Sequence, residues 1–339
     1  MARVVLCTEL GPPETLSVVD QADRPCGAEQ VRIEVGAAGI NFVDALFVAG
    51  TYQIQVPPPF IPGSECAGCI TEVGEAVSEW SIGDRVIANL GLGAYSSSVL
   101  AHQSQLTALP ETVSVGVGAT CGQPYSTAWF ALTRRSRCKP SHTVAVFGAG
   151  SGVGLAACDV AHALGAEVIA VASDHERLEC ATDRGALHTI NSSTEDVNAR
   201  LKELAPGGLD LVVDPVGGSL SEVGLRRLGF DGELLVIGFA SGTIPTLPTN
   251  LVLLRNRRIT GVDWGKWAMD HPDQQRQLFD EVLERIVDGD LNPIEPTHYR
   301  LEEAGAALTA ATTRGVVGRL CLSPSGSPAS SGPSAQALS

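Results

Sequence analysis

The stretch Thr143-Val-Ala-Val-Phe-Gly-Ala-Gly-Ser-Gly-Val-Gly154 decides the fold of this chain. A run of β-branched and apolar residues leads into four glycines within seven residues, and an amphipathic segment follows from Leu155 to Leu164. This order predicts a strand, a tight turn and a helix, as in a nucleotide-binding βα unit. Glycines let the backbone of such a turn approach a pyrophosphate. The free N–H groups and the positive dipole end of the helix would then stabilise its charge.

The spacing of these glycines departs from the G-x-G-x-x-G pattern. Counting from Gly148, the last position is Val153, and counting from Gly150 it is Leu155. A glycine-rich turn between a strand and a helix can also be purely structural. The sequence around the turn therefore has to decide between the two interpretations.

Between residues 125 and 262, expected strands alternate with expected helices. The expected strands are 144–147, 168–172, 187–190, 209–213, 234–238 and 258–262. The expected helices are 126–134, 155–164, 176–184, 195–204 and 220–228. This alternation predicts parallel strands joined by right-handed crossovers, which form a doubly wound α/β sheet.

The chain on either side of this region has a different pattern. Residues 3 to about 110 are β-rich, because short apolar runs at 16–19, 31–35, 69–73 and 85–88 are separated by Pro and Gly clusters. Such spacing favours a barrel or a sandwich. Helices at 274–287 and 301–312 and a strand at 319–322 are expected to return to this first domain. We thus predict one domain of 1–124 with 265–322, a second of 125–264, and a disordered tail of 323–339.

The composition limits the class of function. A chain of 339 residues predicts two domains. Its net charge of −15 argues against a nucleic-acid partner, which needs clustered Lys and Arg. Because no segment has the apolar length of a membrane span or the features of a signal peptide, we expect a cytosolic protein. Nine cysteines favour reduced thiols, and the C-x-x-C of Cys66 and Cys69 is interpreted as buried thiols rather than a metal or redox site.

The residues after the second strand of the expected unit bear on the choice of dinucleotide. That strand ends at Ala172, Ser173 follows, and Arg177 lies one helical turn further along. An acid at the strand end would bind the free 2′-OH of NADH, whereas a nearby cation accommodates the 2′-phosphate of NADPH. We therefore favour NADPH. As alternatives, Ser173 and Glu176 can form a capping box, Arg177 can be a solvated helix residue, and Asp174 can be the ribose ligand.

Further motifs follow one another along the chain: 38–44 AGINFVD, 50–52 GTY, 61–65 IPGSE with Ala67-Gly68, 83–86 GDRV, the glycine turn, 214–218 DPVGG and 235–240 LVIGFA. In this order they resemble the medium-chain dehydrogenase/reductase superfamily, specifically its zinc-independent NADPH:quinone oxidoreductase branch, which includes zeta-crystallin. The resemblance covers about residues 3 to 322. It implies a GroES-like domain around an inserted Rossmann domain, with the active site in the cleft between them.

The resemblance also bears on zinc. Zinc-dependent relatives place a Cys where this chain has Asn41, and a Gly-His-Glu where it has Gly63-Ser64-Glu65. They often carry a four-Cys lobe as well, which is absent here. Because Zn²⁺ needs about four N or S ligands, these differences predict an enzyme without catalytic zinc. The acceptor must then take hydride readily, as quinones and α,β-unsaturated carbonyls do, and the cofactor carries most of the chemistry.

The same resemblance implies a set of site residues. Asn41, Asp44 and Tyr52 would line the cleft beside the nicotinamide, with Asn41 and Tyr52 as candidate hydrogen-bond donors to the developing negative oxygen of the acceptor. Asp44 can instead cap a helix, and Tyr52 can simply pack. The implied cofactor contacts are Thr127 near the phosphates, with Gly148, Ser151, Gly152, Val153, Ser173, Arg177, Ser192, Val216, Gly238 and Phe239.

Two positions depart from the family pattern. The glycine turn of the family commonly reads A-x-x-G-x-x-G or G-x-x-G-x-x-G, whereas this chain has Ser151 at the middle position. The Ser151 hydroxyl can donate to a phosphate. Many members also have a Tyr that packs near the adenosine phosphate at the place of Ser192. Arg177, which matches a common Lys, would carry the phosphate contact with less help.

Three hypotheses follow for the function. The leading one is a cytosolic NADPH-dependent quinone or enone reductase that works by direct hydride transfer, without metal or flavin. The second is an enoyl-thioester reductase, which a wide and basic cleft mouth would favour. The third is an NADPH-binding protein with little turnover, as in crystallins recruited from this family. Relatives are commonly dimers or tetramers, so the resemblance implies a homo-oligomer.

Overall fold

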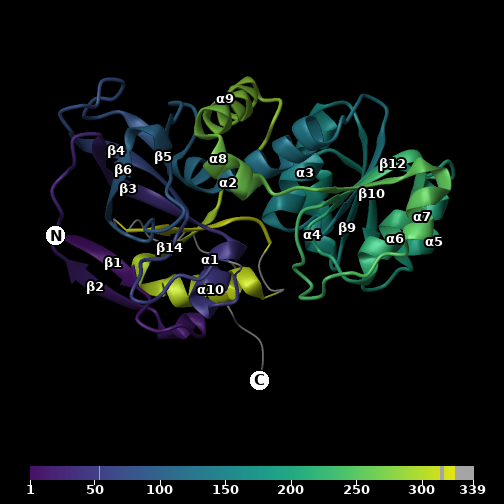
Figure 1. Ribbon diagram of the computed structural model, residues 1–339, viewed down its shortest axis with the longest axis horizontal. Helices are drawn as coiled ribbons and strands as arrows, with labels where there is room; N and C mark the ends of the chain where they lie inside the picture. Colours follow the sequence, from purple (N-terminus) through teal and green to yellow (C-terminus); the bar gives the residue numbers. More distant parts are fainter. Residues whose placement is uncertain (53, 314–316, 325–339) are drawn as a thin grey trace. The chain divides into compact units, whose positions relative to one another are not determined.

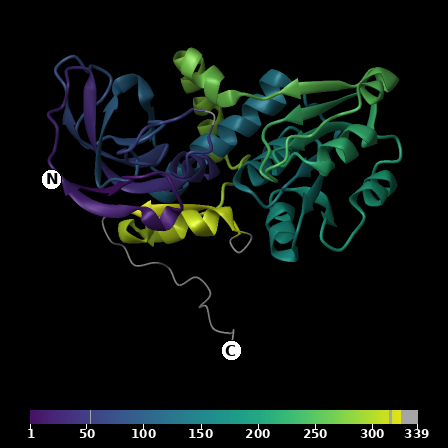
Figure 2. The same cartoon turned by 60° about the horizontal axis from the view of Figure 1, so that its bottom comes forward.

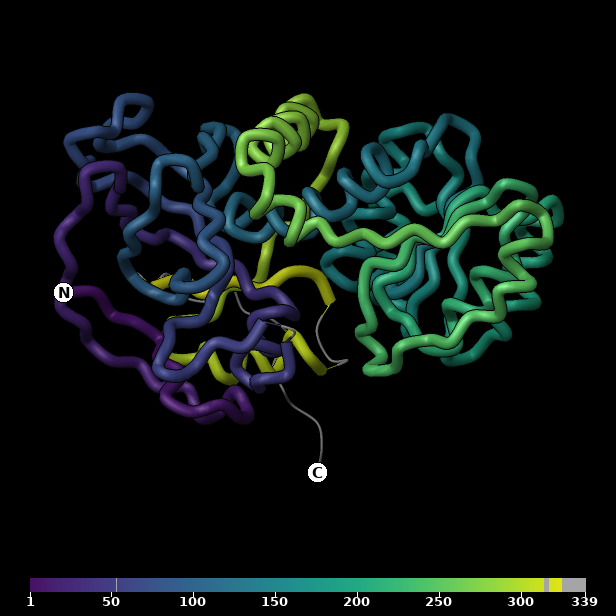
Figure 3. The backbone as a smooth tube through the Cα atoms, in the orientation of Figure 1, coloured from purple at the N-terminus to yellow at the C-terminus, as the bar shows by residue number. Residues whose placement is uncertain are grey.

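The computed structural model describes residues 1–52, 54–313 and 317–324. The chain divides into two compact units: unit 1 runs to Gln123 and resumes at Ile294, and unit 2 is Pro124–Pro293. Figure 3 shows the yellow C-terminal part of the chain running beside the purple and blue N-terminal part within unit 1. The expected tail of 323–339 begins one residue too early, because Ser323 is the last residue of strand β15 (Leu320–Ser323) and is buried. Residues 325–339 lie outside the described residues.

Unit 2 contains a parallel six-stranded sheet. Its strands are β8 (Thr143–Phe147), β9 (Glu167–Ala172), β10 (Ala186–Asn191), β11 (Leu209–Asp214), β12 (Leu228–Val236) and β13 (Arg258–Gly261). Their order in the sheet is β10-β9-β8-β11-β12-β13, and every neighbouring pair is parallel. The order reverses between β8 and β11, so a topological switch point lies at the carboxyl ends of these two strands. The predicted doubly wound sheet is confirmed.

Helices cover both faces of this sheet. They are α3 (Gly152–Ala163), α4 (His175–Thr182), α5 (Val197–Leu204), α6 (Ser219–Arg227) and α7 (Thr249–Leu253). Helix α3 contacts α4, and α5 contacts α6. Figure 1 shows the strands between these two pairs. The core between sheet and helices is built from fully buried side chains such as Phe147, Ile169 and Leu225.

Residues 265–293 belong to unit 2, although we expected them in the first domain. They form α8 (Trp264–Asp270) and α9 (Pro272–Asp288). The Trp129 indole donates to Glu281 over 2.7 Å, and the rings of Phe130 and Trp267 lie 4.6 Å apart. These contacts attach both helices to unit 2. They are invisible to a pattern-based assignment because their partners lie far apart in the sequence.

Unit 1 is built around a mixed seven-stranded sheet. Its strands are β3 (Gln30–Ile40), β4 (Glu65–Val73), β5 (Arg85–Asn89), β6 (Ser98–His102), β7 (Leu106–Ala108), β14 (Thr297–Arg300) and β15 (Leu320–Ser323). A separate two-stranded sheet pairs β1 (Ala2–Leu6) with β2 (Ser17–Gln21). Strand β3 is long enough to pair with β4, with β6 near its start and with β15 at its end, where Leu320 faces Ile40. From Ile294 onward the C-terminal segment thus belongs to unit 1, whose sheet it joins through β15.

Three helices accompany this sheet: α1 (Phe42–Ala49), α2 (Val115–Trp129) and α10 (Ala304–Thr312). Helix α10 packs against α1, beside the N-terminal strands (Figure 2). Helix α1 was not predicted, because its apolar sequence lacks a clear polar face. Its end signals are nevertheless present: Asn41 is the N-cap, and Gly50 ends the helix in the left-handed region at a φ of 68°.

Other elements differ from their expected bounds. Helix α2 starts at Val115 rather than residue 126, and a π-helix from Phe130 to Arg135 continues it. Strand β12 begins at Leu228 and ends at Val236, so Gly238 lies just beyond it. Among the described helices, none combines the length and apolar composition needed to cross a lipid bilayer.

Candidate active site

The glycine turn joins β8 to α3, and Ser151 has a definite place in it. Ser151 is the N-cap of α3, and its Oγ accepts a hydrogen bond of 3.1 Å from the N–H of Gly154. A serine is a preferred N-cap because its hydroxyl satisfies one of the N–H groups that the first helical turn leaves without a partner. The Cβ and hydroxyl that distinguish Ser151 from glycine thus serve to begin the helix three residues earlier than expected.

Gly148 and Gly154 are glycines for different geometric reasons. Gly148 has a φ of 59°, in the left-handed region that side chains disfavour. A Cβ on Gly154 would lie 2.1 Å from the carbonyl oxygen of Gly148, a contact that backbone atoms cannot avoid by turning a side chain. The start of α3 therefore packs directly on the turn.

The turn fits a phosphate. Gly152 and Val153 occupy the first two positions of α3, where a helix supplies no acceptor for the N–H groups, and both residues are partly exposed. Together with the helix dipole, two such N–H groups form a common anion site. Their position at the carboxyl end of β8, beside the switch point, is where doubly wound sheets bind dinucleotides.

Arg177 packs over the turn and pairs with an acid. A Cβ on Gly150 would lie 2.4 Å from the Cβ of Arg177, so the glycine leaves room for the arginine stem. The Nε of Arg177 lies 3.2 Å from Oδ2 of Asp174. Asp174, not Ser173, caps α4 by accepting from the N–H of Arg177 through Oδ1. The alternative in which Ser173 and Glu176 form a capping box is therefore wrong, because the N-cap of α4 is Asp174.

The remaining expected cofactor residues mostly gather at the same edge of the sheet. The Ser192 N–H donates to Ala172 at the end of β9, and Val216 follows the end of β11, where its N–H donates to Asp214. A Cβ on Gly148 would lie 2.8 Å from Cγ2 of Val216, so the two meet. Gly238 and Phe239 follow β12, and Phe239 lies against Gly217. Thr127 instead is buried in α2.

In unit 1, Asn41 lies within a buried polar cluster. Its Nδ2 donates to Oε1 of Glu65 over 2.8 Å and to Oγ of Ser64 over 3.2 Å. Its Oδ1 accepts from the Arg319 guanidinium over 2.7 Å. An amide has two N–H bonds, and both are directed at residues of the cluster. Asn41 therefore has no further donor for an acceptor molecule in this arrangement.

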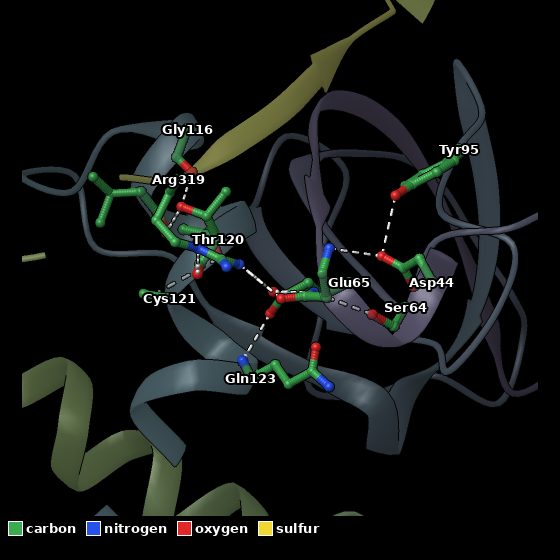
Figure 4. Close-up of polar contacts among 12 residues, drawn as sticks. Asp44, Ser64, Glu65, Tyr95, Gly116, Thr120, Cys121, Gln123 and Arg319 are labelled. Carbon is green, nitrogen blue, oxygen red and sulfur yellow. Dashed lines mark hydrogen bonds and ion pairs between the residues drawn. The ribbon is translucent and has the colours of Figure 1, made fainter. Parts of the chain in front are cut away.

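Glu65 and Arg319 form the charged part of the cluster (Figure 4). Glu65 is buried, and its Oε1 lies 3.7 Å from Nη2 of Arg319. Its Oε2 accepts from the N–H of Gln123, and the Nε of Arg319 donates to the carbonyl of Thr120. Burial raises the pKa of the Glu65 carboxyl, while Arg319 counteracts this shift. These two residues were not among the expected site residues. In the sequence, Glu65 could have been recognised as a candidate because a charged residue stands at the start of an apolar strand.

Asp44 has the geometry of a helix cap, which was one of its two expected roles. Its Oδ2 accepts from the N–H of Asn41 over 2.8 Å and from the hydroxyl of Tyr95 over 3.1 Å. Within the described residues its Oδ1 has no hydrogen-bond partner of good geometry, although the Ser64 hydroxyl is close enough to favour the charged form. Burial raises the pKa of Asp44 to about 7 against these hydrogen bonds.

This shift predicts a pH dependence of stability. Asp44 keeps its proton in the folded chain up to about pH 7 but loses it near 3.8 when unfolded, so the free energy of unfolding falls as pH rises through this window. The full loss is about 4 kcal/mol above pH 7. Asp44→Asn should therefore gain stability relative to wild type between pH 5 and pH 8, measured by urea denaturation. An unchanged difference between the two pH values would contradict the shift.

Tyr52 lies close to the same helix. Its ring packs on Phe47 of α1, with the ring centres 4.7 Å apart and the planes at 53°. This is the packing role that was left open for it, and a phenol can pack with its ring while its hydroxyl serves another purpose.

The C-x-x-C does not bring its two thiols together. Cys66 is buried and Cys69 is exposed, and residues three apart on strand β4 point to opposite faces. Over the described ranges, no group of three or more His, Cys, Asp or Glu side chains could hold a metal ion.

Comparisons with known proteins find matches to dehydrogenases and oxidoreductases over most of the chain. A family model for the alcohol dehydrogenase GroES-like domain matches residues 27–122, and one for zinc-binding dehydrogenases matches residues 152–286. Quinone oxidoreductase-like protein 2 of Mus musculus is 35% identical over 323 residues, which cover 95% of this chain and 92% of the relative. The first of these matches confirms the GroES-like expectation for unit 1.

Solved structures of oxidoreductases share the fold of this chain. The structure of Escherichia coli quinone oxidoreductase complexed with NADPH superimposes with a TM-score of 0.86 at 27% identity, over 96% of this chain and 100% of that one. The structure of the CurK enoyl reductase gives a TM-score of 0.85 at 26% identity, over 95% and 99% of the two chains.

Proposed function

The chain belongs to the medium-chain dehydrogenase/reductase superfamily, among the quinone oxidoreductases, and we propose that it reduces quinones or α,β-unsaturated carbonyls with NADPH and without zinc. The observation that carries this proposal is the turn from Gly148 to Gly154. The turn lies at the carboxyl end of β8, beside the switch point of the parallel sheet, and the N–H groups that begin α3 suit a dinucleotide phosphate. The Escherichia coli relative, solved with NADPH, supports the choice of cofactor.

The residues of unit 2 have defined tasks in this proposal. The N–H groups of Gly152 and Val153 bind the pyrophosphate, and the Ser151 hydroxyl, while accepting from Gly154, retains its own hydrogen for a phosphate oxygen. Arg177 pairs with the 2′-phosphate, for which it must share its charge with Asp174. When bound, the nicotinamide supplies a hydride.

In unit 1, we assign the acceptor to the end of the unit that carries Asn41, Asp44 and Tyr52. Because both N–H bonds of Asn41 are used within the cluster, its task is to hold the side chains of Ser64 and Glu65 in place. Tyr52 is then the candidate donor to the negative oxygen of the acceptor. The amide of Asn41 and the hydroxyl of Ser64 stand where zinc-dependent relatives have ligands, and neither group is a usual zinc ligand.

The proposal is tested by oxidation of NADPH in the presence of 1,4-benzoquinone-type acceptors and simple enones, with and without a chelator. Retained activity in the chelator is expected, and its loss would refute independence of zinc. Absence of oxidation with every acceptor would refute the reductase and leave a dinucleotide-binding protein with little turnover.

A second candidate is an enoyl-thioester reductase, because an enoyl reductase is among the similar solved structures. It differs only in the acceptor. A crotonyl thioester in the same assay separates the two: a kcat/KM for the thioester well above that for free enones would favour this candidate.

Arg177 gives a test of the cofactor preference. Arg177→Glu should lower the preference for NADPH over NADH by roughly 100-fold, because it removes a charge-assisted pair worth about 2–3 kcal/mol. The measurement is the Kd of each dinucleotide by fluorescence titration. Lys202→Glu, an equal charge change at an exposed position on α5, is the control and should leave both constants unchanged. A variant that keeps its preference for NADPH would refute the assignment of Arg177.

A further inference from the structure

Reduction of a quinone or an enone adds a proton as well as a hydride, and unit 1 contains a buried group suited to store one. We propose that Asp44 holds the proton that the acceptor takes up, and that the Ser64 hydroxyl passes it on. This inference rests on the proposed function, and it assigns the proton to a residue that the fold otherwise uses as a helix cap.

The charges of the cluster account for the stored proton. Two carboxyl groups, of Asp44 and Glu65, are buried, and the cation within the cluster is Arg319. Arg319 lies 3.7 Å from Glu65 and compensates its charge. A second negative charge at Asp44 would be buried without compensation, which is costly. Arg319 therefore favours the negative charge on Glu65, and burial favours the proton on Asp44.

The other neighbours of Asp44 do not change this balance. Tyr95 is fully buried and donates to Asp44, and burial and this carboxyl raise the pKa of its phenol well above the usual range, so it stays neutral. Helix α10, which packs against α1, has the sequence AGAALTAAT and no titratable side chain. From the 3-10 helix Pro13–Thr15 comes Glu14, whose carboxylate accepts from Thr309.

The geometry places the proton on the side of Ser64. Oδ2 of Asp44 already accepts two hydrogen bonds, from Asn41 and Tyr95, so the proton belongs on Oδ1. Ser64 is 8% exposed, whereas Asp44 and Tyr95 are 0% exposed. A proton that leaves Asp44 thus reaches solvent or an acceptor most directly through the Ser64 hydroxyl, which can accept one proton and release another.

The transfer is balanced in atoms and charge. The O–H bond at Oδ1 breaks as Ser64 Oγ takes the proton, and the original hydroxyl proton of Ser64 moves to the anionic oxygen of the reduced acceptor. Asp44 becomes a carboxylate, and water returns a proton to it through the same hydroxyl. No electrons move within the protein in this step.

Asp44→Asn tests the proposal in the full-length protein. We expect the wild-type kcat to fall as pH rises above about 7, where Asp44 loses its proton. The variant should have a kcat lower by roughly 100-fold, the smaller end of the usual contribution of an acid group, and no pH dependence in this range. KM should change little, because the Asp44 side chain is fully buried and, in this proposal, reaches the acceptor only through Ser64. Ser64→Ala should flatten the profile in the same way.

Two further measurements separate proton storage from a purely structural role. Tyr95→Phe removes a hydrogen bond that favours the carboxylate, so it should move the midpoint of the pH profile upward while preserving kcat at low pH. Infrared difference spectra of wild type against Asp44→Asn should show a protonated carboxyl band that titrates near pH 7.

A wild-type pH profile in Asp44→Asn, or no titrating carboxyl in the spectra, would overturn the inference while the proposed function stands. If the wild-type protein fails to oxidise NADPH with every acceptor tested, the proposed function itself is refuted, and the inference with it.

Discussion

Replacing Arg319 by Met should lower the free energy of unfolding by about 3–5 kcal/mol, the usual cost of removing one partner from a buried ion pair. Arg319 compensates Glu65, which is 2% exposed, and holds the Asn41 side chain through a hydrogen bond of 2.7 Å. Without the guanidinium, Glu65 is a buried charge with no cation beside it. The measurement is urea denaturation of the variant and the wild-type protein at pH 7.5.

Two companion variants make this result specific. Arg300→Met removes an arginine of unit 1 that pairs with Glu303 and is 61% exposed, so it should cost less than about 1 kcal/mol. The double variant Arg319→Met/Glu65→Gln should recover part of the loss, because it removes the uncompensated charge. A double variant no more stable than Arg319→Met alone would show that the loss comes from packing rather than from charge.

Gly154→Ala is expected to disable the dinucleotide site. The new Cβ would lie 2.1 Å from the carbonyl oxygen of Gly148 and 2.8 Å from Cα of Ala149, so the start of α3 must move away from the turn. Loss of the two phosphate-binding N–H groups should weaken NADPH binding by roughly 100-fold or more. Overpacking should also destabilise the fold by about 1–3 kcal/mol. Isothermal titration calorimetry and thermal unfolding measure the two effects.

Gly207→Ala is the matched control for this variant. Gly207 also belongs to unit 2, and a Cβ there would meet no atom within 4 Å. Both binding and stability should therefore stay close to wild type. Tight binding of NADPH by Gly154→Ala would refute the assignment of the turn, because the site could not then depend on the close contact between Gly148 and Gly154.

Much of unit 2 could be predicted because its signals are local. The glycine turn, the apolar strands and the helical segments between them follow one another in the sequence, and parallel crossovers leave few arrangements. Ser151 shows the limit of this reasoning. The sequence has a serine where the family has a glycine, but only the tertiary structure shows that its hydroxyl accepts from Gly154 and caps α3.

Unit 1 was harder to predict. Helix α1 has an apolar sequence without a strong helical pattern, so the β-rich interpretation of residues 3 to 110 missed it. The expected donor role of Asn41 came from the resemblance, and pattern alone cannot show that Glu65 and Ser64 already use its two N–H bonds. That information depends on which side chains face each other across the sheet.

The sequence by itself determined the doubly wound domain, its place inside a second domain and the position of the glycine turn, because strand periodicity and turn chemistry are properties of neighbouring residues. Only the tertiary structure decided the buried cluster. Asn41 and Arg319 are 278 residues apart, and they meet because β15 pairs with the end of β3. Burial then sets the charge of each carboxyl, since a pKa depends on the groups that surround it in space and not on its neighbours in the chain.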